Sequence, residues 1–240
     1  KLEYRYLDEV EAELAAKGKA GNLFDEYTFL VEKSRWDIIE KLKELVEQID
    51  SGNFANWAFR SIFSFNFDRH LYKPLIHIKD SELKVIPVAL NDGEKKFVLD
   101  LKDYYEANHG SFNGRELYLL RNLGRGHGVG FFQAHNFYPD FILWLVEGKK
   151  QRITFIDPHG MRMAQGGFND PKVQFHQEIK TLEKQIGDTD VTLSSFIISV
   201  TPFEQIGLWN KKLTPKDFED HHIVFQNDKS LYISKIIKDA

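Results

Sequence analysis

The sequence contains no cysteine among its 240 residues. Disulfide bonds and thiolate metal sites are therefore excluded, and a cytoplasmic protein is expected. No run of 18 apolar residues and no signal peptide is present, so neither a transmembrane nor a secreted protein is expected. The chain begins with Lys1 instead of Met, so we expect a fragment of a longer protein or a processed chain.

An excess of positive charge is also missing. Lys and Arg number 32 against 36 Asp and Glu, and the net charge is −4. A protein that grips DNA by itself usually carries a basic patch or an excess of Lys and Arg. Two interpretations therefore stay open: either a partner domain supplies the affinity for DNA, or the chain does not bind nucleic acid.

The first 87 residues are expected to form a helical scaffold or linker region with short strands. Asn22 is a plausible N-cap for a long helix that continues to about Gln48. Alternating Phe residues at 63, 65 and 67 predict a strand, and short strands are also expected at 75–78 and 83–86.

Residues 88–240 have the pattern of an α/β domain, a mixed sheet flanked by helices. Asp170 can cap a helix, Pro171 suits its first turn, and Gly187 ends it. The apolar run around Phe141 suits a strand that is covered on both faces. The expected elements, in order, are a helix at 94–106, strands at 116–120, 137–146 and 151–157, a helix at 171–186 and a strand at 191–200.

Two aspartates stand where this pattern predicts neighbouring strands. Asp140 interrupts a hydrophobic strand after Pro139, and Asp157 ends the next strand. Because removing a carboxylate from water is costly, a buried strand rarely carries one without a partner or a cation. Carboxylates on adjacent hairpin strands meet at one end of a sheet and offer the hard oxygen ligands that Mg²⁺ prefers.

Glu94 is a third candidate ligand. It lies in the first turn of the expected helix, at the start of the apolar stripe, so its side chain should face the sheet. The alternative is a capping box, in which Asn91 is the N-cap and Glu94 reaches back to it. The two roles do not exclude each other.

Residues 88–205 resemble the PD-(D/E)XK nuclease domain at the C-terminal end of type III restriction enzyme Res subunits and related DEAD/DEAH-box helicase-nucleases. The resemblance covers roughly half of the chain and implies a restriction-endonuclease-like fold. The segments that carry it are Ala89-Leu90-Asn91-Asp92-Gly93-Glu94, Asn136-Phe137-Tyr138-Pro139-Asp140-Phe141-Ile142-Leu143-Trp144 and Phe155-Ile156-Asp157-Pro158-His159-Gly160.

The resemblance implies a catalytic group of Asp140, Asp157, Glu94 and His159, with Mg²⁺, or Mn²⁺ in its place, held by the three carboxylates. His159 stands where the family has a lysine, which is thought to orient the attacking water and to offset phosphate charge. A histidine can bind water and act as a general base, but it supplies no permanent charge. Lys150, Arg152 or Arg162 could supply that charge from nearby.

The function that the resemblance implies is a metal-dependent endonuclease that hydrolyses double-stranded DNA in restriction or phage defence. No Walker A motif or DEAD-type box is present, so the helicase/ATPase motor would be a separate domain or subunit. The alternative is a catalytically inactive module that keeps the nuclease fold for DNA binding or assembly. A purely structural α/β domain would leave Asp140 unexplained.

Overall fold

The computed structural model describes most of the chain. The described residues are 28–31, 35–51, 57–59, 62–65, 75–79, 84–86, 89–122, 129–131, 137–161, 166–206, 213–228 and 230–239. The chain divides into two compact units, Glu3–Lys95 and Lys96–Ala240 together with Lys1–Leu2, and each is described by itself. No helix in the described ranges is long and apolar enough to cross a lipid bilayer.

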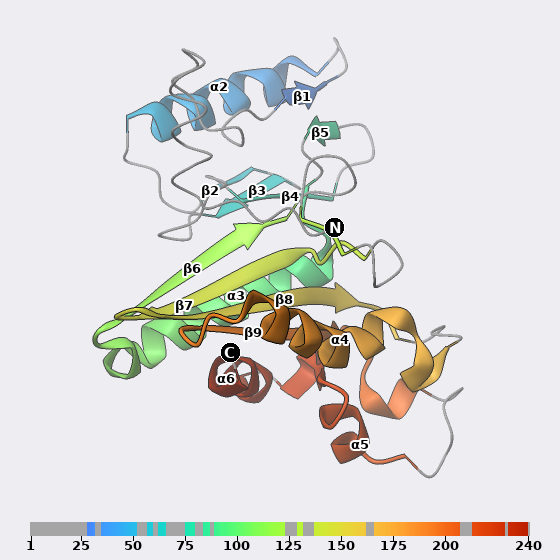
Figure 1. Ribbon diagram of the computed structural model, residues 1–240. Helices are drawn as coiled ribbons and strands as arrows, with labels where there is room; N and C mark the ends of the chain where they lie inside the picture. The colour runs from blue at the N-terminus through green and yellow to red at the C-terminus, as the bar shows by residue number, and fades with distance from the viewer. Residues whose placement is uncertain are drawn as a thin grey trace. The chain divides into compact units, whose positions relative to one another are not determined.

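In the described residues of the N-terminal unit, two small antiparallel sheets accompany helix α2 (Figure 1). Strand β1 (Thr28–Leu30) pairs with β5 (Lys84–Ile86). The second sheet has the order β2-β3-β4. Its strands are Trp57–Phe59, Ile62–Phe65 and Leu75–Ile78, and helix α2 is Trp36–Asp50. Ile38, Leu42 and Leu45 of α2 pack with Ile62 of β3.

The structure corrects the expected start of the long N-terminal helix. That helix begins at Trp36, because residues 28–30 form a strand instead. Their partner strand, β5, lies more than 50 residues further along the chain. Tertiary pairing of this kind overrides local periodicity. Asn22 and Phe67 lie outside the described residues, whereas the strands at 75–78 and 84–86 are confirmed.

The C-terminal unit is built on a five-stranded mixed sheet of order β10-β9-β8-β7-β6. Strands β6, β7 and β8 are antiparallel, whereas β8, β9 and β10 are parallel. The strands are Arg115–Arg121, Phe141–Glu147, Lys150–His159, Val191–Ser199 and Ile223–Phe225. The helices are α3 (Asp92–Ala107, which starts in the N-terminal unit), α4 (Pro171–Ile186), α5 (Pro215–Glu219) and α6 (Ser230–Asp239). The expected α/β fold class, with β7 and β8 paired between flanking helices, is confirmed.

Local chemistry explains the central hairpin and helix α4. Gly148, at φ 61°, forms the turn between β7 and β8 together with Lys149. At the start of α4 the Asp170 carboxylate accepts a hydrogen bond from the backbone N–H of Lys172, and at its end Gly187 adopts φ 69°. These are the caps that the sequence predicts.

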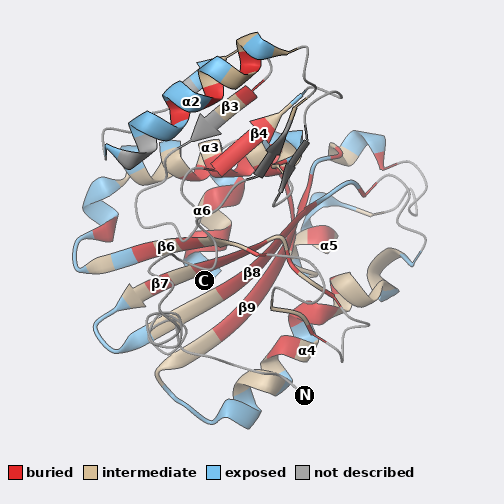
Figure 2. Ribbon diagram, turned by 90° about the horizontal axis from the view of Figure 1, so that it is seen from above, coloured by how far each residue is buried: buried red, intermediate tan, exposed pale blue. Residues whose placement is uncertain are grey.

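Alternation along the strands divides the sheet into two faces. Ile142, Phe155 and Leu193 pack with Phe175 and Ile179 of α4. On the opposite face the ring of Phe141 meets that of Phe97 in α3, with centroids 5.1 Å apart. Burial increases along β8 towards its C-terminal half (Figure 2). Because side chains repeat with period two, the face covered by α4 also carries positions 140, 157 and 159.

Two strand boundaries differ from expectation. Strand β7 begins at Phe141 instead of residue 137, because Phe137 pairs with Phe131 in an isolated bridge. Asp140 therefore precedes β7. Strand β8 continues to His159, because its parallel partner β9 pairs with it as far as Ser199. Asp157 consequently lies inside β8.

Candidate metal centre

Asp140 and Asp157 lie opposite each other at one end of the β7–β8 hairpin. The last β7–β8 pair is Phe141 with Ile156, so the next residue on each strand is one of the two aspartates. When Asp140 is protonated, its carboxyl group can donate a hydrogen bond to that of Asp157. The Asp157 side chain is 5% exposed and that of Asp140 is 30% exposed. The structure therefore brings together the two carboxylates that the sequence predicted as a pair.

Burial and charge repulsion raise the pKa of Asp140 to about 6. Burial is the largest cause, followed by the charge of Asp157, while Arg121 and Lys172 act in the opposite direction. Without a metal ion Asp140 is therefore partly protonated near pH 6, and its proton reduces the repulsion between the two carboxyl groups. This behaviour, together with a purely oxygen donor set, fits Mg²⁺.

Two cations flank the pair, one on each carboxylate. Arg121 places Nη1 3.5 Å from Asp140 Oδ1 and donates a 3.0 Å hydrogen bond to the Asp140 carbonyl. Lys172 donates from Nζ to Asp157 Oδ2 at 3.1 Å. The charges of two aspartates and two cations cancel in the absence of a metal ion.

The backbone carbonyl of Pro158 lies on the side of β8 that faces β7. The carbonyl of His159 accepts from Val200 N–H on the β9 side. Carbonyls alternate in direction along a strand, so that of Pro158 points to the opposite side, where the pairing with β7 has already ended. A proline fits there for the same reason, because its missing N–H has no strand partner to lose.

Glu94 forms the capping box. Its Oε2 accepts from Asn91 N–H at 2.8 Å, and its own N–H donates to Asn91 Oδ1 at 2.9 Å. Its side chain is buried. Glu94 belongs to the N-terminal unit, so its role as a metal ligand stays a prediction. Within the described part of the chain, no three His, Cys, Asp or Glu side chains gather closely enough to hold a metal ion by themselves.

His159 lies at the end of β8. It is exposed, and the charge of Asp140 acts on its imidazole. Partial burial lowers its pKa, the Lys172 charge lowers it further, and Asp170 and Asp140 oppose both. The imidazole is therefore neutral near pH 7. A neutral ring can accept a proton from water, but it does not replace the charge of a lysine.

Two of the three expected sources of that charge, Lys150 and Arg152, do not reach the pair. Lys150 and Arg152 lie seven and five residues from Asp157 on the same strand, which is roughly 23 Å and 17 Å along β8. Arg162 lies outside the described residues. Lys172, which was not predicted from the sequence, is the lysine in contact with Asp157. Its position in the first turn of α4, the helix that covers the Asp157 face, could have indicated this contact from the sequence.

Asn122, also missed, secures the backbone around Asp140. Its N–H donates to the Asp140 carbonyl at 2.8 Å, and its Nδ2 donates to the carbonyls of Pro139 and Val129 at 2.7 and 2.8 Å. Its Oδ1 accepts from Val129 N–H. This buried amide joins the end of β6 to the segment that enters β7.

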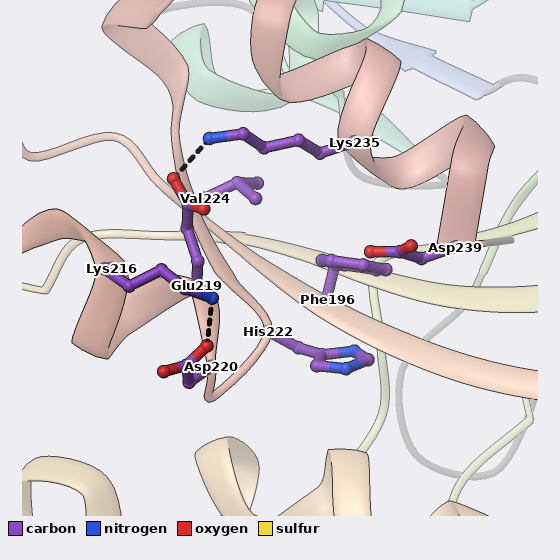
Figure 3. A pocket seen from close by; sticks show the side chains of 8 residues that line it. All are labelled: Phe196, Lys216, Glu219, Asp220, His222, Val224, Lys235 and Asp239. Atoms are coloured by element: carbon purple, nitrogen blue, oxygen red, sulfur yellow. Dashed lines mark hydrogen bonds and ion pairs between the residues drawn. The ribbon is translucent and has the colours of Figure 1, made fainter.

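A separate hollow of about 320 Å³ lies between α5, β10 and α6 (Figure 3). Its lysines are already paired, Lys235 with Glu219 and Lys216 with Asp220. None of its lining residues belongs to the carboxylate pair or contacts it in any recorded interaction. We therefore assign the candidate chemistry to the Asp140–Asp157 end of the sheet.

Comparison with known proteins gives no family. No family model matches the chain, and no curated protein matches it. Among solved structures, one that is similar is titled "Crystal structure of protein VC1899 from Vibrio cholerae", with a TM-score of 0.31 and 9% sequence identity. The match covers 97% of this chain and 49% of that one, so this chain spans about half its length.

Proposed function

We propose that residues 88–240 form a metal-dependent endonuclease domain that hydrolyses phosphodiester bonds in double-stranded DNA. The observation that carries the proposal is the pair of facing carboxylates, Asp140 and Asp157, at the end of a buried hairpin. Proteins rarely bury two acids against each other, because both lose hydration and repel. A divalent cation removes that cost.

In this proposal Asp140, Asp157 and the Pro158 carbonyl would hold Mg²⁺, and the family resemblance adds Glu94 to the ligands. The ion would polarise the phosphodiester and lower the pKa of a bound water. His159, neutral at pH 7, accepts the proton of the attacking water. The water oxygen bonds to phosphorus and the ester P–O bond breaks. The leaving oxygen takes a proton from solvent, which gives a phosphate monoester and a free hydroxyl.

The lack of an excess of positive charge in the chain supports a further part of the proposal, a helicase/ATPase motor domain or subunit that holds the duplex. With a net charge of −4, this chain is not suited to strong DNA binding by itself. The alternative function, an inactive nuclease-fold module for DNA binding or assembly, is favoured by one observation, His159 in place of the family lysine.

A nicking assay on supercoiled plasmid separates the two functions. We expect the wild-type chain to nick in Mg²⁺ or Mn²⁺ between pH 6 and 9, and Asp140→Asn to be inactive. The matched control is Asp103→Asn, at an exposed aspartate on α3 that forms no ion pair within the described part of the chain. Absence of metal-dependent nicking by the wild type at every pH would favour the inactive module.

A further inference from the structure

Lys172 is a charged group beside the carboxylate pair to which the proposed function assigns no role. It stands in the first turn of α4, where Asp170 fixes its backbone through a 2.8 Å hydrogen bond. Its Nζ lies 3.1 Å from Asp157 Oδ2 and 5.3 Å from the ring centroid of Phe137. Its side chain is 40% exposed, whereas Asp157 is 5% exposed. The ammonium group of Lys172 therefore contacts the buried Asp157 carboxylate, while part of the lysine side chain remains accessible to a ligand.

Building on the proposed function, we propose that Lys172 of helix α4 is the catalytic lysine of this site and binds the scissile phosphate. The geometry allows this because positions 157 and 159 share the face that α4 covers. A cation from the helix and a cation from strand position 159 would therefore enter the same space. The lysine that is missing at His159 is supplied from α4.

The local charge supports a phosphate ligand. Asp140, Asp157, Arg121 and Lys172 sum to zero without a metal ion. A bound divalent cation raises the sum to +2 and weakens the attraction of Lys172 for Asp157, since the cation now neutralises that carboxylate. The flexible lysine stem then allows the ammonium to turn to the phosphate oxygens. The site becomes a phosphate binder when it is loaded with metal.

The test compares Lys172→Met with Lys180→Met. Lys180 is on the same helix, is 42% exposed and is also ion-paired, with Glu183 at 2.9 Å. We expect Lys172→Met to lose about 10²- to 10³-fold in nicking rate, the usual cost of one stabilising donor. Its Mg²⁺ affinity by calorimetry should be unchanged or higher, because a competing cation is gone. Lys180→Met should match the wild type in both.

Two outcomes would overturn the inference. One is wild-type nicking by Lys172→Met. The other is a loss of Mg²⁺ affinity that accounts for the loss of rate, because Lys172 would then only support Asp157. The double variant Lys172→Met/His159→Lys tests rescue by a lysine on the strand. We expect it to nick at least about tenfold faster than Lys172→Met alone.

Duplex binding in Ca²⁺ provides a readout that needs no turnover. We expect Lys172→Met to reduce the dependence of log affinity on log salt by about 1, the signature of one lost phosphate contact, and Lys180→Met to leave it unchanged. If the wild type never nicks, the proposed function has failed. The salt slopes then still decide whether Lys172 contacts phosphate, and equal slopes for the two variants would reject that contact.

Discussion

Replacing Asp140 with asparagine should stabilise the protein while it abolishes metal binding. Asp140 ionises with a pKa of about 6 in the folded chain against 3.8 as the ordinary value. Between these values the folded state binds more protons than the unfolded state, so the free energy of unfolding falls as pH rises from about 4 to 6. The cost is fully present above pH 6.

The magnitude follows from the difference between the two pKa values. A difference of about 2 corresponds to about 3 kcal/mol. Because the Asp140 side chain is 30% exposed, solvent screening reduces this to about 1–2 kcal/mol. An asparagine amide keeps the hydrogen bond to Asp157 and carries no charge. We therefore expect Asp140→Asn to be about 1–2 kcal/mol more stable than the wild type at pH 8, with little difference at pH 4.

Urea denaturation of the full chain at pH 4, 6 and 8, without divalent ions, measures this difference. Asp103→Asn is the control and should stay within about 0.5 kcal/mol of the wild type. Mg²⁺ at about 100 times its Kd should stabilise the wild type by about 2.7 kcal/mol and leave Asp140→Asn unchanged. If Asp140→Asn is no more stable than the wild type at pH 8, the two carboxylates do not oppose each other in the folded protein.

Four further predictions concern the carboxylate pair and helices α3 and α4. Because a proton on Asp140 competes with the metal, Mg²⁺ affinity measured by calorimetry should increase about tenfold for each unit of pH increase up to pH 6. A pH-independent affinity would contradict this competition. Asp157→Asn should bind no Mg²⁺. Glu94→Gln preserves the capping box, so the midpoint of urea unfolding should hold while Mg²⁺ affinity falls about tenfold; an unchanged affinity would restrict Glu94 to capping. Asp170→Ala should cost about 1 kcal/mol in urea unfolding through the lost N-cap, and a neutral result would contradict the cap. Burial and then the His221 charge lower the pKa of His176 in the folded chain, so the protein should become less stable as the pH drops below 6.5. In His176→Phe the melting temperature should therefore decrease less between pH 7 and pH 5 than in the wild type. An equal decrease in both proteins would show that other groups cause the loss of stability.

The carboxylate pair was predictable because the register of a hairpin follows from the position of its turn in the sequence. Asp140 and Asp157 stand on either side of a two-residue turn signal at Gly148, so counting outward from the turn sets them opposite each other. Period two then assigns both to one face. Helix α4 was predictable to the residue for a related reason, because Asp170, Pro171 and Gly187 mark its ends within the sequence itself.

The cations could not be predicted in the same way, because they come from other elements. Lys172 is brought to Asp157 by the packing of α4 on β9 and β8, and Arg121 reaches Asp140 across the β6–β7 pair. The sequence offered Lys150, Arg152 and Arg162 as sources of the missing charge and did not choose among them. Lys150 and Arg152 lie toward the far end of β8 from Asp157. The N-terminal strand at 28–30 was missed for a comparable reason, since its partner is a distant strand.

The identity of residue 159 now has an electrostatic explanation within the proposed site. A lysine at 159 would project onto the face where Lys172 already contacts Asp157, and two ammonium groups that share one carboxylate repel each other. A neutral histidine avoids that repulsion. His159→Lys should therefore help far more in the Lys172→Met background than in the wild type, where it adds a second positive charge. A double-mutant cycle of nicking rates measures this coupling. If the two substitutions act independently, residues 159 and 172 do not occupy the same space beside the metal ion. The proposal that Lys172 on the helix replaces a lysine at strand position 159 is then wrong.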